Sequence, residues 1–309
     1  YSDCTTMGLA IRANREFTAM DQPRLWIKRG IKVEKLIDAP NYEPVGEGAL
    51  YESSNNFAEL VHSILTDKRW GLGEYIQPEL VDRDAFIVTA RFLEQNRLSF
   101  DGVIEDRQNV RQYITGLAPM FLCNFTVKNG KFALTPAVPI DNQGNYSNVA
   151  VPISAMFSEG NIIEDSFELA FLELTERENF QAVMQFRRSG PHELPETKSI
   201  VVRWKEQGNE GISENFDMST YCTRRGHAGT AARYLLSVRK RIDHTISFKT
   251  SPAGLSLGPG DYIKVVTESN PYQPSQNGVI LAEDLTVVSA LGLMDGTYSI
   301  TYYLPGATE

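Results

Sequence analysis

The sequence predicts an α+β fold in which β-structure predominates. Three observations lead to this class. Residues 55–118 carry helical apolar patterns, residues 121–135 form a hairpin signal directly after them, and from residue 166 onward short alternating runs outnumber the single helix that interrupts them. Helices grouped together and followed by strands are typical of α+β proteins rather than of alternating α/β folds.

The first predicted helix begins at Phe57. Apolar side chains recur at three- and four-residue spacing over Phe57–Leu65, which places them on one helix face. Asn56 is the expected N-cap, and Glu59 stands where the second residue of a capping box would stand. We expect the helix to end near Gly71 or Gly73, since glycine tolerates a left-handed C-terminal position.

Two further helices are expected before the hairpin. Pro78 suits the first turn of the second helix, and Asp106 is a good N-cap for the third. Their buried faces are expected to consist of Phe86, Ala90 and Leu93, and of Val110, Tyr113, Ile114 and Leu117.

The strongest local signal is the hairpin. Two alternating runs, Phe121–Val127 and Lys131–Thr135, flank Asn129-Gly130. Asn-Gly favours a type I′ turn, because both central residues of that turn need a positive φ. The sequence therefore predicts two antiparallel strands joined by a tight turn.

The remaining sequence is predicted to be mainly strands and turns. Residues 1–40 alternate weakly, with Met7, Leu9 and Ile11 as the clearest run, and residues 136–165 look like a loop. A helix with a face of small residues is predicted around Ala228–Leu236. A tight turn is predicted at Gly258-Pro259-Gly260-Asp261. Strands are expected at Leu25–Val33, Phe167–Leu174, Ala182–Arg187, Ser199–Trp204, His244–Thr250, Asp261–Thr267 and within Gly278–Tyr303.

These elements suggest four segments. Residues 1–45 are expected to end a first β-rich domain, and residues 46–138 to form a helical and hairpin module. Residues 139–270 are expected to form a β-domain with one helix, and residues 271–309 a C-terminal β-extension.

Composition limits the function classes. The 309 residues include 30 basic and 39 acidic side chains, a net charge of -9, which argues against broad nucleic-acid binding. There is no apolar run near 18 residues, so no transmembrane helix is predicted. The three cysteines, Cys4, Cys123 and Cys222, form no disulfide framework. A start at Tyr1 suggests a piece of a longer protein.

The chemistry-bearing residues favour no active site. Cys222, His227 and His244 lack the paired short spacing of a structural zinc site, and His62 is expected to be a surface or partly buried histidine. No nucleophile elbow, His-Glu-x-x-His or Walker A motif occurs. Arg224–Arg241 is rich in arginine and could contact nucleic acid, but ion pairs at a subunit interface or a position in solvent are favoured. We assign no catalytic, cofactor-binding or metal-ligating residue.

Several segments together resemble a known family. Four segments occur in the order found in lambda-type phage tail tip attachment proteins, also called central tail hub proteins. They are Phe57–Gly73, Leu98–Arg107, the alanine-rich Arg224–Arg241 and Leu257–Ile263. The first of them contains the run Leu-Thr-Asp-Lys-Arg-Trp-Gly-Leu-Gly. Thr6–Arg12 and Lys28–Val33 resemble the strand pair before the helices of that family. The resemblance covers about residues 5–267.

The resemblance implies a structural component of a bacteriophage tail tip, without cofactors and without catalysis. Such a protein is a homotrimer of barrel- or sandwich-like β hub domains with a small helical insertion module. It caps the tail tube and contacts the distal tail protein, the tape-measure protein and the tail fibre or tip proteins. It meets the host receptor indirectly, and DNA passes its lumen without specific binding. Its location is the virion tail tip, assembled in the cytoplasm of the bacterial host.

The motif residues are expected to have structural roles. Arg69, Trp70 and Gly71 are expected to form a packing corner that closes the first helix, and the others to form turns. The complete set is Arg69, Trp70, Gly71, Gly73, Asn129, Gly130, Pro259, Gly260 and Asp261.

Two alternatives remain open at this stage. A tail-associated glycan or peptidoglycan hydrolase would need two carboxyl groups about 5–10 Å apart in a cleft. A receptor- or carbohydrate-binding module would need an exposed aromatic platform. The candidate carboxylates are Glu159, Glu164, Asp165 and Glu168, and the candidate aromatic residues are Tyr272, Tyr298, Tyr302 and Tyr303.

Overall fold

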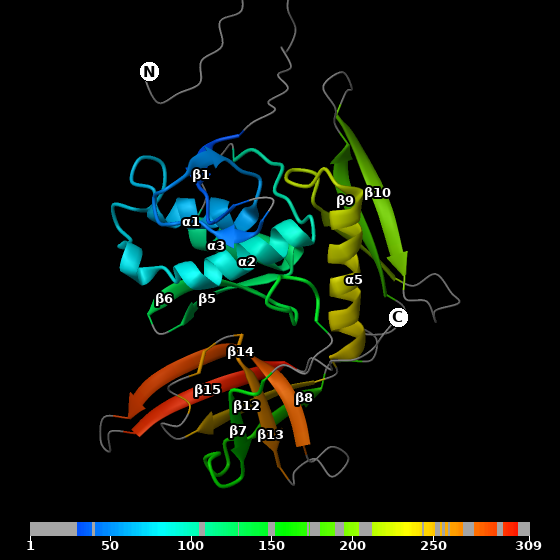
Figure 1. The fold of residues 1–309 in the computed structure, drawn as a ribbon. Coiled ribbons are helices and arrows are strands. Elements are labelled where there is room, and N and C mark those ends of the chain that lie inside the picture. The colour runs from blue at the N-terminus through cyan, green and yellow to red at the C-terminus, as the bar shows by residue number, and fades with distance from the viewer. Residues whose placement is uncertain are drawn as a thin grey trace, which may run out of the picture.

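Figure 1 shows the fold in a computed structural model of the protein. The described residues form five β-sheets and a group of helices, and their buried apolar side chains make two hydrophobic cores. The structure describes residues 30–38, 41–104, 109–128, 130–147, 152–171, 173, 180–188, 195–203, 212–242, 244–250, 254, 257–258, 260–267, 275–288 and 293–301. The predicted run at Met7, Leu9 and Ile11 lies outside these residues.

Short strands precede the helices. β1 (Lys32–Glu34) pairs with β4 (Tyr51–Ser53), and β2 (Ile37–Asp38) pairs with β3 (Glu43–Pro44), both antiparallel. The helices that follow are α1 (Phe57–Thr66), the 3-10 helix η1 (Pro78–Leu80), α2 (Arg83–Gln95), α3 (Val110–Leu117) and the 3-10 helix η2 (Ala118–Phe121).

The start of α1 confirms one predicted cap and corrects another. Asn56 Oδ1 accepts a hydrogen bond from Ala58 N at 3.0 Å, as an N-cap should. Glu59 does not complete a capping box, because Ser54 Oγ accepts from Asn56 N instead. The fully buried Glu59 carboxylate accepts from Leu36 N at 3.0 Å and from Lys35 Nζ at 2.5 Å, and it also accepts from Ser54 Oγ. Glu59 therefore anchors the segment after β1 to α1.

The end of α1 differs from the prediction. The helix stops at Thr66, and the chain then folds back so that Leu72 N donates to Ile64 O at 2.7 Å. A Cβ on Gly71 would lie 2.4 Å from Ile64 O, and one on Gly73 would lie 2.1 Å from Thr66 O. Neither glycine has a positive φ. Both are needed because the backbone passes too close to the helix end for a side chain.

The other two helices begin later than predicted. Pro78 starts η1, whereas α2 starts at Arg83 after Asp82, whose Oδ1 accepts from Ala85 N at 3.1 Å. α3 is capped by Asn109, and Asp106 lies outside the described residues. The predicted faces are confirmed: the α2 face and Ile114 are buried, and the remaining α3 residues pack partly buried against the same core.

The predicted hairpin is present. β5 (Cys123–Lys128) and β6 (Lys131–Pro136) pair antiparallel, with Lys128 opposite Lys131. Gly130 has a φ of 74°, as the turn requires, and Asn129 lies outside the described residues. The hairpin packs under α2, where Thr89 Oγ1 donates to Leu134 O.

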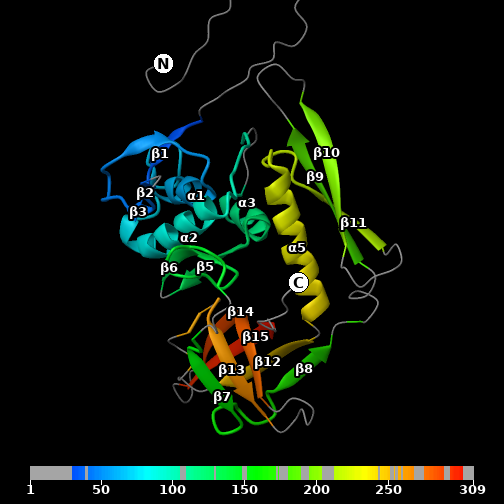
Figure 2. The same ribbon diagram turned by 45° about the vertical axis from the view of Figure 1, so that its right-hand side comes forward.

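A three-stranded sheet and a long helix share the core of the helical region. Their order is β10 (Glu196–Arg203), β9 (Phe180–Arg188) and β11 (Ile212–Asp217), with β11 parallel to β9, and β11 was not predicted. α5 (Arg225–Arg241) lies between this sheet and the shorter helices (Figure 2). The predicted small-residue face is confirmed, since Ala228, Ala231 and Ala232 are buried in this core. Without long side chains on that face, α5 can lie close to its neighbours.

The second core belongs to a six-stranded sheet. Its order is β7 (Ala155–Ser158), β13 (Tyr262–Val266), β14 (Ser275–Val288), β15 (Leu293–Thr301), β12 (His244–Thr250) and β8 (Glu168–Phe171). β7 lies within residues 136–165, which were wrongly predicted to be a loop throughout. Among the described strands no pairing joins β7 to β8, so the sheet is open. The α+β, mainly β class is confirmed, whereas the four-segment division stays a prediction.

Candidate functional site

Two predicted motifs that are far apart in the sequence meet at the junction of the two cores. Lys128 ends β5, directly before Asn129-Gly130, and Asp261 ends the Leu257–Asp261 turn. Lys128 Nζ lies 2.6 Å from Asp261 Oδ1 and 2.8 Å from Oδ2. This ion pair joins the hairpin of the helical region to the six-stranded sheet.

Two backbone N–H groups of the turn that carries Asp261 make hydrogen bonds. Gly258 N donates to Asp261 Oδ2 at 2.9 Å, and Gly260 N donates to Ile280 O at 2.8 Å. Gly260 has a φ of 95°, a conformation that favours glycine. A Cβ on Gly258 would lie 3.0 Å from Lys128 Cγ, so the lysine chain packs directly on this turn. Pro259 lies outside the described residues.

The third predicted motif lies elsewhere, at the end of α1. Asp67 Oδ1 accepts from Arg69 N at 2.7 Å and from Trp70 N at 3.3 Å. The Arg69 side chain is exposed and lies 3.7 Å from the Asp67 carboxylate. Trp70 packs half-buried against the first core. The functional role of Arg69, Trp70 and Gly71 stays a prediction.

Hydrogen bonds of Asp101 join the helical region to β9 and to the start of α5. Asp101 Oδ2 accepts from Thr223 Oγ1 at 2.7 Å, just before α5 begins, and Asp101 O accepts from Arg187 Nη2 at 2.8 Å. Asp101 belongs to Leu98–Arg107, one of the segments of the sequence resemblance. This segment therefore helps to hold β9 and α5 against the shorter helices.

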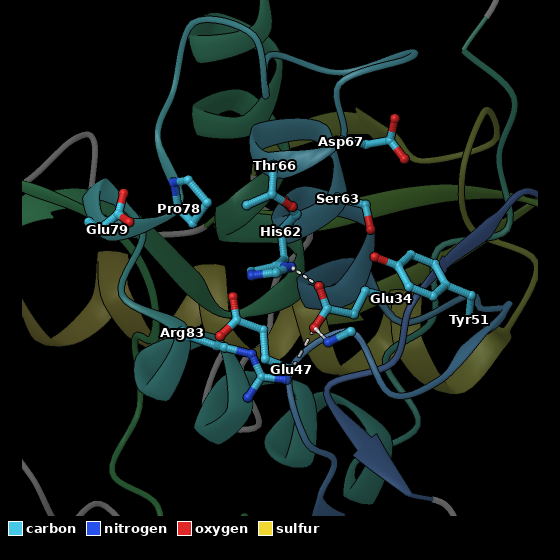
Figure 3. A pocket seen from close by; sticks show the side chains of 11 residues that line it. Glu34, Glu47, Tyr51, His62, Ser63, Thr66, Asp67, Pro78, Glu79 and Arg83 are labelled. Carbon is cyan, nitrogen blue, oxygen red and sulfur yellow. Dashed lines mark hydrogen bonds and ion pairs between the residues drawn. The ribbon is translucent and has the colours of Figure 1, made fainter.

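The helical region also contains a pocket of about 410 Å³ (Figure 3). It lies between β1, α1 and the beginning of α2. Its lining residues are Glu34, Glu47, Gly48, Tyr51, His62, Ser63, Thr66, Asp67, Pro78, Glu79 and Arg83.

Glu34 is the central acidic group of this pocket. Its Oε1 accepts from Gly48 N at 3.0 Å and from Arg83 Nη2 at 3.2 Å. Arg83 Nη2 also donates to Val45 O at 2.9 Å, so this end of the arginine is held in place. Arg83 Nε is buried without an acceptor among the described residues.

His62 faces the other oxygen of Glu34. The histidine is only 4% exposed, more buried than the surface or partly buried position that was predicted. Its Nδ1 lies 4.0 Å from Glu34 Oε2, too far for a hydrogen bond, and it has no other partner in the described part of the chain. Burial lowers the pKa of His62, against the opposing effect of Glu34. The ring is therefore neutral at neutral pH.

The residues considered for zinc do not gather in one place. Cys222 Sγ contacts Arg224 O at 3.4 Å, His227 Nε2 lies 2.9 Å from Met120 O, and His244 lies in β12. Burial raises the pKa of the Cys222 thiol to about 11, so it is protonated at neutral pH. No group of three or more His, Cys, Asp or Glu side chains in the described ranges is placed to hold a metal ion.

The carboxylates considered for catalysis lie on exposed positions around β7 and β8. Glu159, Glu164, Asp165 and Glu168 are all exposed, at the end of β7, in the following loop and at the start of β8. Tyr298 lies in β15 opposite Phe248, and the other three tyrosines lie outside the described residues. No helix in the described part of the chain is long and apolar enough to cross a membrane.

Sequence reasoning missed the pocket residues Glu34 and Arg83 and the junction residue Lys128. One signal for Glu34 exists, because a carboxylate stands between Val33 and Leu36, which are both buried. A charged side chain within an apolar run often has a specific partner. Nothing in the sequence indicates that this partner is Arg83, 49 residues away.

Comparisons with known proteins find similarity at the level of structure. No protein-family model and no curated protein matches the sequence. The chain is similar to a chain in the virion of a native gene transfer agent particle, with 14% identity and a TM-score of 0.49 over 73% of this chain and 49% of that one.

Two further solved structures are tail proteins. One is the tail protein from Neisseria meningitidis MC58, with 12% identity and a TM-score of 0.43 over 64% of this chain and 56% of that one. The other is the 43 kDa tail protein of prophage MuSo2 from Shewanella oneidensis, with 10% identity and a TM-score of 0.38 over 64% of this chain and 55% of that one. The chain spans about half the length of the structures it matches.

Proposed function

We propose that the protein is a structural component of a bacteriophage tail tip, a central hub that caps the tail tube. The observation that carries this proposal is the sequence resemblance, whose segments occur in the family's order over about residues 5–267. Two of those segments take part in contacts within the described residues. Phe57–Gly73 forms α1 and its returning loop, and Leu257–Ile263 forms the turn that contacts the hairpin through Asp261 and Lys128.

The proposed assembly is a homotrimer in the virion. Its neighbours would be the distal tail protein, the tape-measure protein and the tail fibre or tip proteins, with an indirect role at the host receptor. DNA would pass through its lumen without specific binding. Assembly would take place in the cytoplasm of the bacterial host. The Lys128–Asp261 ion pair is one contact between the two cores, as an adaptor that holds them together would need.

We propose a structural rather than a catalytic role. Glycoside hydrolysis needs two carboxyl groups that flank the scissile bond. The four carboxylates considered from the sequence are exposed on and around a loop. In the pocket, Glu34 Oε1 is already engaged by Gly48 and Arg83. None of these observations favours the hydrolase alternative.

The first experiment is the mass of the purified chain by light scattering over a concentration series. A hub is expected to give a species of three times 34.6 kDa. A species of 34.6 kDa at every concentration would contradict trimerisation of this chain. Release of soluble fragments from purified peptidoglycan, tested in parallel, would favour the hydrolase and contradict the structural role.

A further inference from the structure

The two hydrophobic cores are separate from each other. The buried apolar side chains of the helical region and the three-stranded sheet form one cluster, and those of the six-stranded sheet form another. Among the described residues the two clusters share no member. Figure 1 and Figure 2 both show the β5–β6 hairpin between α2 and the six-stranded sheet. The hairpin is thus the part of the first core that lies next to the second.

The contact between the hairpin and the turn before β13 consists of small and charged groups. Lys128 Nζ lies against the Asp261 carboxylate, and the lysine stem lies on Gly258, where an added Cβ would be 3.0 Å from Lys128 Cγ. An added Cβ on Gly260 would be 3.7 Å from Thr135 Oγ1. Contacts between two parts of a chain permit relative movement unless they are large and apolar. These glycines, a hydroxyl group and an ion pair form a contact of the kind that can separate.

The ion pair in this contact is accessible to water and ions. The Lys128 side chain is 36% exposed and that of Asp261 is 16% exposed. Dissolved salt screens such a pair more than it screens a buried one. The strength of the contact therefore depends on ionic strength.

The end of α5 forms a second connection, and this one is made by the backbone. α5 belongs to the first core and ends at Arg241, and β12 of the six-stranded sheet begins at His244. Ile242, between them, is buried, and its N donates to Val238 O at 3.0 Å. So short a connection keeps β12 beside the helix end, whereas the contact at the hairpin is made by the Lys128 side chain.

We propose that the Lys128–Asp261 ion pair is a latch between the two cores. In the closed form the pair holds the six-stranded sheet against the hairpin. In the open form the pair is broken, and the sheet has turned about the end of α5 and away from the hairpin. Ionic strength sets the ratio of the two forms. The proposal rests on the contact between the cores and does not depend on the role in a phage tail.

The test measures the distance between two nitroxide spin labels, one on each core, by pulsed electron paramagnetic resonance. Glu94→Cys in α2 and Lys249→Cys in β12 place the labels on exposed positions. Cys4→Ser removes one native thiol, and the thiols of Cys123 and Cys222 are buried and escape labelling. The labelled chain is mixed with an excess of unlabelled chain. The measured distances then lie within one chain, whatever its oligomeric state.

The closed form is expected to give one distance at low ionic strength. In about 1 M NaCl, where the Debye length is about 3 Å, a second distance is expected to appear. Lys128→Met is expected to raise the ratio of open to closed form about two- to tenfold at low ionic strength, as for the loss of a partly exposed ion pair. Asp261→Asn is expected to act in the same direction, and it keeps an oxygen acceptor for Gly258 N.

Two control variants separate the latch from general charge effects. Lys128→Arg keeps the positive charge and should give the distances of the parent chain. Lys198→Met breaks an exposed ion pair with Glu196 on β10, removes the same charge, and should also leave the distances unchanged.

Two results would overturn the proposal. The first is a distance distribution that is the same in the parent chain, in Lys128→Met and in Asp261→Asn, whether or not salt alters it, because the pair then does not hold the closed form. The second is an equal response in Lys128→Met and Lys198→Met, which would assign the change to net charge and not to the contact with Asp261.

Discussion

Lys128 Nζ contacts both carboxylate oxygens of Asp261, 133 residues further along the chain, at 2.6 and 2.8 Å. The lysine side chain is 36% exposed and the aspartate 16%, so water screens this pair only in part. We expect a double-mutant cycle with Lys128→Met and Asp261→Asn to give a coupling free energy of about 1 kcal/mol. Urea unfolding of the four proteins measures this coupling.

The control for that cycle is the Lys198–Glu196 pair on β10, whose side chains are 40% and 62% exposed. Its coupling is expected to stay below about 0.5 kcal/mol. Equal coupling in both pairs would mean that the contact between hairpin and turn adds nothing beyond an ordinary surface ion pair.

Gly71 and Gly73 are expected to be intolerant of any side chain. A Cβ at either position would lie within 2.4 Å of a carbonyl oxygen of α1, so Gly71→Ala and Gly73→Ala require the loop to move. We expect each to lower the free energy of unfolding by about 2–4 kcal/mol. Gly116→Ala is the matched control, since a Cβ in that α3 position meets no atom within 4 Å. That variant should be up to about 1 kcal/mol more stable than the wild type.

Glu59 is expected to be a major contributor to stability. Its buried carboxylate accepts from Leu36 N and Lys35 Nζ, and a Glu59→Ala variant leaves Leu36 N without an acceptor and Lys35 Nζ with only Ser54 Oγ at 3.4 Å. We expect a loss of about 3–5 kcal/mol, the usual cost of removing one partner of a buried ion pair. The exposed Glu52→Ala in β4 is the control. If the midpoint of thermal unfolding falls equally in both variants, Glu59 contributes no more to stability than an exposed glutamate does.

Stability is expected to fall on mild acidification. Burial lowers the pKa of His62 and of His227 below the ordinary value of 6.5. The unfolded chain then binds protons more readily than the folded one, so the stability is complete above pH 6.5 and is lost as the pH falls from there toward the folded pKa values. Each histidine can contribute a slope of up to about 1.4 kcal/mol per pH unit.

Urea unfolding at intervals between pH 8 and pH 5 measures this slope. His62→Gln and His227→Gln remove one titrating ring each, and each variant should show a smaller loss over the same interval. An unchanged slope in both variants would assign the acid sensitivity to other groups.

Local patterns predicted the elements that depend on local sequence. The apolar spacing in Phe57–Leu65 and the Asn129-Gly130 signal gave α1 and the hairpin, because helix faces and tight turns are set by neighbouring residues. β7 and β11 were missed, and each pairs in parallel with a strand distant in sequence, β13 and β9. The expected left-handed conformation of Gly71 was wrong: its φ is not positive, and a side chain is excluded there because it would meet the carbonyl oxygen of Ile64.

The candidate site was less predictable than the fold. Glu34 and Arg83 meet across 49 residues and Lys128 and Asp261 across 133, and no local signal indicates either pairing. The sequence did identify the Asn129-Gly130 and Gly260-Asp261 turns separately. That they lie against each other follows only from the way the hairpin packs on the six-stranded sheet.

The first core can be completed only after α5 has been synthesised. Phe57 and Leu236 belong to the same buried cluster, so a nascent chain that has emerged only as far as α3 cannot complete it. At a translation rate of about 5–20 residues per second, on the order of ten seconds or more pass between the synthesis of α3 and that of α5. During that interval the aromatic cluster around Phe57 and Phe121 is open to the chaperones of the cell. Chains truncated before α5 should therefore aggregate rather than fold.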